Sequence, residues 1–357
     1  MLRSVIDQFR LARDHLRRRL AMWVWDRPTK SVGPFVDRVV FVRWDAKLGD
    51  TVVLSWVLRE LQRQRPDLEL TVITGPEFEN LFRHGYGIQS IYLAGRRNGW
   101  RELKRIAKSL HKPRYVVHLG AIWRPRDLFF VNKLQAEHVV GLDDGLSMID
   151  IKLGERTRGW HFSDKLAPWL DEMGVDTSNR QYWVPRSDEQ KKKVMQWWPA
   201  QSDVIGFCPF GASRKRHLPI EIIKRIIRAV LDKPATRILM LAPPYLAAEL
   251  QKSLVHESWF DRLIFAPTNH VLELFEQVAH CKAMISVDTA LVHIASGLAL
   301  PLVALYAAQS PDSDNMLCWY PKASQAISLI AKNEQPDLMG EFDAVQLKGA
   351  IDQVLGT

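Results

Sequence analysis

The chain has 357 residues, 47% of them hydrophobic, and its 49 lysines and arginines exceed its 40 acidic residues to give a net charge of +9. This length predicts two domains, and the charge favours acidic or anionic partners such as nucleic acid, anionic lipid or phosphorylated glycans. The three cysteines lie far apart without metal-ligand spacing, which argues against a disulfide framework or a zinc site and fits a reducing compartment.

The first stretch, residues 2–28, has apolar residues at helical spacing with most arginines elsewhere around the helix, and Pro28 ends the pattern. It predicts a basic amphipathic helix and lacks the cleavage site of a secretory signal. Two interpretations stay open. The helix lies on anionic lipid, which Trp23 and Trp25 favour, or it packs on the first domain with a solvated basic face.

The next stretch predicts a βαβ unit, with a strand over residues 38–43, a loop ending in Leu48-Gly49-Asp50, a helix to about Arg65 and a strand ending at Thr74. It has no glycine fingerprint for phosphate. The carboxylate of Asp50 is therefore either a general base or a cap of the helix. Further strands, alternating with helices, are expected over residues 88–93, 115–119 and 138–142.

Residues 96–114 contain a dense group of lysines and arginines with a single acidic residue, Glu102. Such a cluster is either a solvated helix face or a grip on the phosphate groups of an acceptor. Under the second interpretation, Arg96, Arg97 and Arg101 are the candidates for acceptor binding.

A looser stretch up to about residue 199 predicts a crossover to a second α/β domain. That domain opens with a strand over residues 204–208, the loop PFGASRKRHLP and a helix from Pro219 to about Asp232. In the loop, a turn of small residues ends at Ser213 and is followed by cations that include Lys215 and Arg216. Backbone N–H groups and cations together suit a diphosphate. The alternative is a cluster of surface cations.

The stretch AMISVDTALVHIASGLALPLVALYA, residues 283–307, predicts strand, turn, short helix and strand. Asp288 and Thr289 fall at the turn, and His293 follows about one helical turn later. Ligands bind at such turns because unpaired helix N–H groups point there. The alternative is a core unit in which Asp288 only caps the helix. Further strands are expected over residues 236–242 and 262–266, and a final helix over 343–355.

Together, the Gly49-Asp50 pair, the segment Arg216-His217-Leu218-Pro219 and the turn from Asp288-Thr289-Ala290 to His293 resemble glycosyltransferase family nine, the lipopolysaccharide core heptosyltransferases. The resemblance covers about residue 38 to the C-terminus. It implies an α/β fold of two facing Rossmann-like domains, of the GT-B type, with the active site in the cleft between them. It also implies inverting transfer of a heptose from ADP-heptose to the phosphorylated lipopolysaccharide core, without a metal or another cofactor.

The resemblance also implies roles for individual residues. Asp50 matches the catalytic base, and Arg216 falls where the family has a diphosphate-binding lysine, beside Ser213 and Lys215. Asp288 matches the sugar contact. The diphosphate turn is matched by Thr289, Ala290, Leu291 and His293, although Ala290 stands where glycine is common.

The expected organisation is an extension over residues 1–36, an acceptor domain over 37–185, a donor domain over 186–340 and a C-terminal helix over 341–357 that crosses back to the first domain. A lipopolysaccharide acceptor implies a peripheral location on the cytoplasmic face of the inner membrane, with the N-terminal helix on its anionic surface. Other possibilities are a different nucleotide sugar or acceptor, a nucleotide-sugar epimerase, or a non-catalytic nucleotide-sugar-binding assembly protein. No recognition motif supports a nucleic-acid partner.

Overall fold

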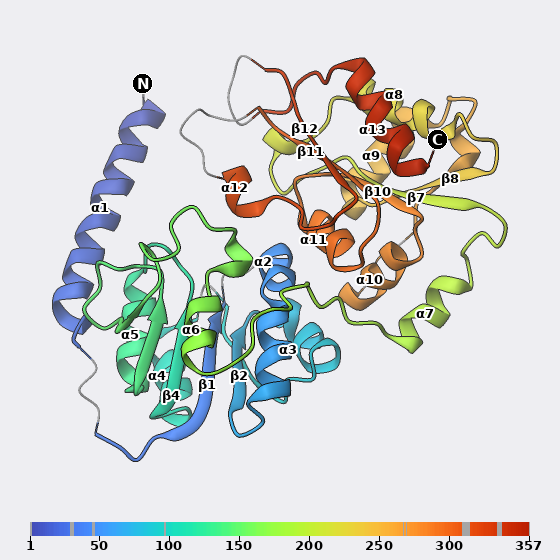
Figure 1. Cartoon of the computed structure of the whole chain (residues 1–357). Coiled ribbons are helices and arrows are strands. Elements are labelled where there is room, and N and C mark those ends of the chain that lie inside the picture. The colour runs from blue at the N-terminus through green and yellow to red at the C-terminus, as the bar shows by residue number, and fades with distance from the viewer. Residues whose placement is uncertain are drawn as a thin grey trace. The chain divides into compact units, whose positions relative to one another are not determined.

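The computed structural model of the chain describes residues 2–28, 32–44, 47–95, 98–266, 268, 270–308, 315–333 and 338–356. The chain divides into two compact units, one formed by Met1–Ala46 with Val57–Arg180 and the other by Lys47–Trp56 with Gln181–Thr357. Each unit has a parallel sheet with helices around it (Figure 1). The predicted fold class, α/β with two Rossmann-like domains, is confirmed.

The first sheet has, among the described residues, six parallel strands in the order β3-β2-β1-β4-β5-β6. Their bounds are β1 Val36–Arg43, β2 Glu69–Thr74, β3 Ser90–Leu93, β4 Pro113–His118, β5 His138–Gly141 and β6 Ile151–Lys152. In the central strand, Val40 pairs with Thr71 of β2 and Val116 of β4. The middle of β1 is entirely buried, as expected of a parallel strand covered on both faces.

Helices of the first unit cover this sheet with faces whose apolar residues recur at helical spacing. On α4, for example, Leu103, Ile106 and Ala107 are buried. The helix bounds are α1 Leu2–Trp25, α3 Ser55–Gln64, α4 Trp100–Ser109, α5 Pro125–Leu134 and α6 Ala167–Glu172. In the described part of the chain, no helix is both long enough and apolar enough to cross a membrane.

The second sheet has, again among the described residues, six parallel strands in the order β12-β11-β10-β7-β8-β9. Their bounds are β7 Asp203–Cys208, β8 Thr236–Met240, β9 Leu263–Ile264, β10 Ala283–Val287, β11 Leu302–Tyr306 and β12 Ala326–Ile330. Numbered from its own first strand, this sheet has the same order as the first. Strand order reverses between β7 and β10, and ligands of open α/β sheets bind beyond the carboxyl ends of the strands at such a reversal.

The helices of the second unit pack on this sheet through a continuous apolar core. Ile222 and Ile226 of α8 (Ile220–Leu231), for example, join a buried cluster with Ile205 and Phe207 of β7. The helix bounds are α2 Leu48–Val53, α7 Asp188–Met195, α8 Ile220–Leu231, α9 Pro244–Leu254, α10 Val271–Ala279, α11 Ala290–Gly297, α12 Asn315–Trp319 and α13 Ala344–Leu355.

The helix predicted to run to about Arg65 is instead two helices, α2 and α3, separated at Leu54. The buried hydroxyl of Ser55 donates to the carbonyl of Val52 at 2.6 Å and accepts from the backbone N–H of Trp183 at 2.7 Å. This side chain therefore satisfies backbone groups at the break. Helix α2 also belongs to the second unit, whereas from the sequence this segment is expected in the first domain.

The last helix, α13, packs on β11, β12 and α8. Its buried side chains include Leu347 and Ile351, which belong to the core of the second unit. From the sequence, this helix is expected to cross back to the first domain. In the structure its apolar face is instead used within the second unit, because that face completes the cover of β11 and β12.

Candidate functional site

Two polar loops of the second unit meet where its strand order reverses, one after β7 and one after β10. Asp288 and Thr289 directly follow β10, and Arg216 lies in the loop after β7. An Nη1 atom of Arg216 is 2.9 Å from Oδ2 of Asp288, although 72 residues separate them. The structure thus joins two of the predicted donor-binding residues in one ion pair.

The cap of α11 is Thr289 and not Asp288. The hydroxyl oxygen of Thr289 accepts a hydrogen bond from the backbone N–H of Leu291 at 3.2 Å, and it lies 3.1 Å from the hydroxyl of Ser286. Both residue types are good helix caps. The interpretation in which Asp288 only caps the helix is therefore wrong, because its carboxylate is engaged by Arg216 instead.

The ion pair is partly buried. The side chain of Asp288 is 15% exposed and that of Arg216 is 37% exposed. Burial raises the pKa of Asp288, while the positive charges of Arg216 and Lys47 oppose the shift. Lys47, which directly precedes α2, was missed by the sequence analysis. Its signal was a lysine two residues before the Gly49-Asp50 pair.

The loop after β7 is closed tightly upon itself. The N–H of Gly211 donates to the carbonyl of Arg216 at 3.0 Å, and a Cβ at Gly211 would lie 2.4 Å from the Cβ of Arg216. Only glycine fits there without moving the loop. Ser213 and Lys215 follow on the exposed part of the loop, so the structure leaves both side chains accessible.

Asp50 is the third residue of α2 and is partly buried. Its Oδ2 accepts a long hydrogen bond, 3.3 Å, from the backbone N–H of Lys47. The carboxylate therefore does interact with the start of its helix, as the capping interpretation holds. One long, half-exposed hydrogen bond leaves the carboxylate available for a second role.

The helix that carries Asp50 packs closely on α11. A Cβ at Gly49 would lie 3.2 Å from Cδ2 of His293 and 3.4 Å from Cα of Ala290. Two small residues, Gly49 and Ala290, therefore let the helices approach. His293 itself is buried and lies edge-on to Tyr182, with ring centroids 6.1 Å apart. The side chain of His293 thus belongs to the packed contact between α2 and α11.

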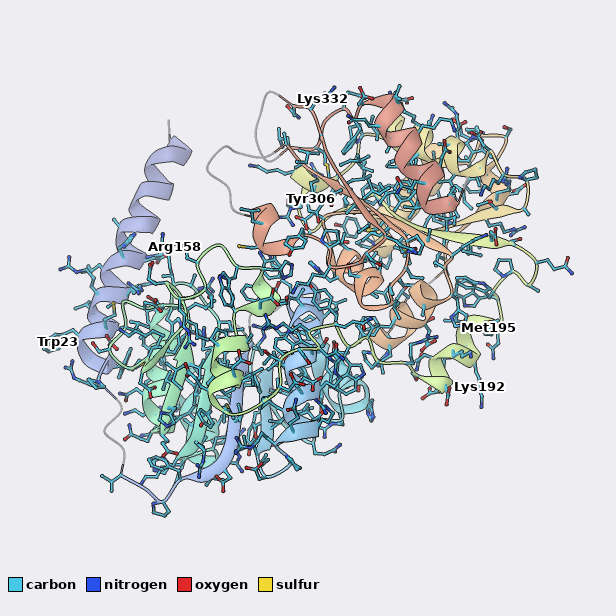
Figure 2. The ribbon with its side chains drawn as sticks, viewed as in Figure 1. Trp23, Arg158, Lys192, Met195, Tyr306 and Lys332 are labelled. Carbon is cyan, nitrogen blue, oxygen red and sulfur yellow. The ribbon has the colours of Figure 1, made fainter. Side chains whose placement is uncertain are left out.

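Tyr306 is a second residue that the sequence analysis missed. It ends β11, is 2% exposed, and its hydroxyl has no hydrogen-bond partner among the described residues (Figure 2). Burial raises its pKa strongly, and the nearby charge of Asp288 raises it further, against the opposing effect of Arg216. The sequence signal for it was a tyrosine, whose hydroxyl is polar, at the carboxyl end of the apolar run that forms β11, the strand next to β10.

The predicted acceptor residues belong to the first unit. Arg96 and Arg97 lie outside the described residues, and Arg101 is exposed in the first turn of α4. The structure therefore gives Arg101 an accessible side chain and says nothing of the other two.

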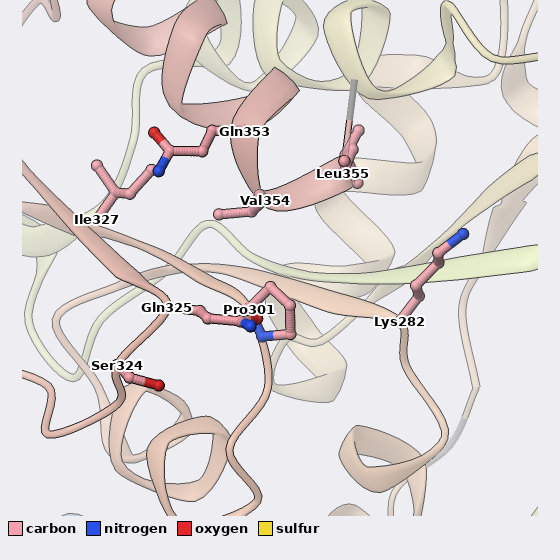
Figure 3. Close-up of a pocket in the computed structure, with 9 residues that line it drawn as sticks. Lys282, Pro301, Ser324, Gln325, Ile327, Gln353, Val354 and Leu355 are labelled. Atoms are coloured by element: carbon pink, nitrogen blue, oxygen red, sulfur yellow. The ribbon is translucent and has the colours of Figure 1, made fainter.

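A pocket with a volume of about 480 Å³ lies elsewhere in the second unit (Figure 3). Lys282, Pro301 and Gln325, which line it, precede β10, β11 and β12, and the end of α13 completes it. It contains none of the predicted site residues. Within the described ranges, no group of three or more histidine, cysteine, aspartate or glutamate residues is arranged to hold a metal ion.

Comparison with known proteins agrees with this architecture. The family model described as glycosyltransferase family 9 (heptosyltransferase) matches residues 162–341. A family 9 glycosyl transferase from Veillonella parvula is 15% identical with a TM-score of 0.70, over 92% of this chain and 100% of that chain. ADP-heptose LPS heptosyltransferase II of E. coli is 15% identical with a TM-score of 0.71, over 89% of this chain and 99% of that chain.

A third similar structure is E. coli heptosyltransferase WaaC with ADP, at 14% identity and a TM-score of 0.66, over 89% of this chain and 99% of that chain. Comparison with curated protein sequences gives no match. At these identities the structural matches show a shared GT-B fold, and the family model supplies the evidence for the kind of enzyme.

Proposed function

The chain belongs to glycosyltransferase family 9, the heptosyltransferases, and we propose that it moves a heptose from ADP-heptose to the core oligosaccharide of lipopolysaccharide with inversion. The observation that carries the proposal is the ion pair of Arg216 and Asp288 at the reversal point of the second sheet. A cation and a carboxylate placed together there suit the diphosphate and the sugar hydroxyls of one donor. The ADP bound to a similar E. coli heptosyltransferase supports the choice of nucleotide.

In this proposal the donor diphosphate binds between the loop after β7 and the start of α11. Arg216 and Lys215 neutralise its charge, and Ser213 donates a hydrogen bond from the exposed turn. The amino end of α11, at Ala290, contributes the positive end of the helix dipole. Asp288 accepts from a sugar hydroxyl.

The proposed chemistry is a single displacement at the anomeric carbon. Asp50 takes the proton of an acceptor hydroxyl as its oxygen forms the new bond, and the bond from the anomeric carbon to the diphosphate breaks. The departing ADP carries the electron pair and is stabilised by Arg216 and Lys215. These cations supply the charge neutralisation for which other transferases use a metal ion. Thr289 and His293 hold α11 and α2 in the geometry that this requires.

The proposed acceptor is the phosphorylated core of lipopolysaccharide, reached from the cytoplasmic face of the inner membrane. The net charge of +9 and the basic segment 96–114 suit such a polyanion. Arg96, Arg97 and Arg101 are the proposed contacts to its phosphate groups. The chain would be peripheral on this membrane, since its acceptor is carried there.

The test is transfer with purified components. The protein is mixed with ADP-heptose and a delipidated, phosphorylated core acceptor, and the product is analysed by mass spectrometry for the added heptose. A matched reaction without acceptor detects isomerisation or hydrolysis of the donor, which an epimerase would catalyse. Transfer by the wild-type protein and its loss in Asp50→Asn support the proposal. Transfer only from a different nucleotide sugar, or donor turnover without acceptor, overturns it.

A further inference from the structure

Helix α1 is attached to the first unit through one narrow face. Ala21 is buried, and Met22 and Trp25 pack against the core of that unit. Arg18 lies on the same face, where its Nη2 is 2.8 Å from Oδ2 of Asp143. These contacts fall at residues 18, 21, 22 and 25, the spacing of a single stripe on a helix.

The apolar residues on the opposite face of α1 have no cover. Leu16 is 60% exposed, Leu20 55%, Trp23 71% and Val24 48%. At 3.6 residues per turn, this set is centred about 180° around the helix from the attached stripe. Trp23 accordingly lies on the outer side of α1 (Figure 2). The sequence alternative of a packed helix with a solvated basic face is therefore only half right, because the face left in solvent is also apolar.

The exposed apolar face is flanked by uncompensated positive charge. Arg17, Arg19 and Arg27 are exposed, and none of them has an acidic partner in the described part of the chain. Two aspartates of this segment are already engaged, Asp14 by Arg13 and Asp26 by the backbone N–H groups of Ser147 and Met148.

We propose that this outward face of α1, formed by Leu16, Leu20, Trp23 and Val24, docks on an anionic lipid bilayer. Apolar side chains with a tryptophan enter the interface, while neighbouring arginines reach the headgroups. A second copy of the chain fits the charge less well, because it would bring the same arginines together. Charge complementarity thus selects an anionic lipid surface.

The attachment of α1 also determines where this surface lies on the first unit. Asp143 accepts from both Arg18 and the backbone N–H of Trp123, and the Nε of Arg18 donates to the carbonyl of Trp123 at 3.2 Å. Trp123 follows β4, so α1 is fastened at the carboxyl edge of the first sheet. If the proposed function holds, on which this step rests, the bilayer that carries the acceptor is bound beside the edge where an acceptor would enter.

The experiment measures sedimentation of the full chain with vesicles of phosphatidylcholine, with or without phosphatidylglycerol. We expect binding to the anionic vesicles. The variant Leu16→Gln/Leu20→Gln/Trp23→Gln should bind at least about tenfold more weakly, because apolar insertion drives interfacial binding. Substituting Arg17, Arg19 and Arg27 together by glutamine should weaken binding to anionic vesicles on the order of 100-fold and abolish the preference for phosphatidylglycerol.

The matched control is Met195→Gln/Val255→Gln/Val345→Gln, which removes three exposed apolar side chains from the second unit. It should bind vesicles as the wild type does. Equal binding by the wild type and both α1 variants overturns the proposal. So does a dimer that the apolar α1 variant dissociates while vesicle binding stays unchanged. Transfer to a delipidated acceptor is measured alongside, because its failure with intact vesicle binding refutes the proposed function alone.

Discussion

Replacing Arg216 by alanine should weaken binding of ADP more than the loss of one contact implies. A hydrogen bond to a charged group contributes about 1.5–3 kcal/mol, which corresponds to a change of about 10- to 150-fold in Kd. In addition, the carboxylate of Asp288, only 15% exposed, would lose its partner at 2.9 Å and face the incoming diphosphate alone. We therefore expect a loss near the upper end, about 100-fold.

Titration calorimetry with ADP separates the two contributions. The double variant Arg216→Ala/Asp288→Asn should recover part of the affinity, because the uncompensated carboxylate is gone. Burial already raises the pKa of Asp288, and removal of Arg216 takes away an opposing effect, so the pKa should rise further. The penalty of Arg216→Ala should consequently shrink as the pH falls and Asp288 becomes protonated. Unchanged ADP affinity in Arg216→Ala and in Lys215→Ala/Arg216→Ala would refute this reasoning.

Three further predictions concern other parts of the chain. Asp50→Asn should keep its ADP affinity but lose transfer by about 10²- to 10⁴-fold, and wild-type turnover would remove this carboxylate from the mechanism. Gly49→Val should lower the free energy of unfolding by about 1–3 kcal/mol in urea titrations, because it crowds α11 at 3.2 Å. Its control, Gly349→Ala, adds a Cβ with nothing within 4 Å and should be neutral or stabilising. Glu276 is buried, which raises its pKa, but its hydrogen bonds to Arg186 and to the backbone outweigh this and lower the pKa. The stability it contributes is therefore present above its ordinary pKa and lost as the pH falls, so Glu276→Gln should cost about 1.5–3 kcal/mol at neutral pH, and a cost that stays constant into acid would contradict this assignment.

The central strands were predictable from the sequence because a strand that is buried on both faces consists mostly of consecutive apolar residues. The middle of β1, Val39 to Val42, and nearly all of β10 are apolar, as parallel strands between two layers of helices must be. The two-residue strand β6 is too short to show such an apolar run. The break between α2 and α3 depends on Ser55 and the N–H of Trp183, which is 128 residues away, so no local pattern announces it.

The candidate site shows the same limit. The motif from Asp288 to His293 was visible as a turn, yet Asp288 and Thr289 are both good caps, and local preference cannot rank them. Arg216, distant in sequence, decides between them by engaging the carboxylate. On α1, the sequence correctly predicts an amphipathic helix. The face that packs carries Arg18, which is paired with Asp143, and the buried Ala21, whereas hydrophobicity alone suggests the opposite face.

The assignment of residues 47–56 to the second unit has a practical meaning for anyone who divides or recombines this protein. A single cut near residue 180 yields an N-terminal fragment that retains α2 but lacks α11, the helix on which α2 packs. The C-terminal fragment loses α2 and uncovers the packed side of α11. A chimaera between relatives that exchanges donor halves must therefore transfer this short segment as well. Otherwise the residues at positions 49 and 290 must both be small enough for α2 and α11 to pack.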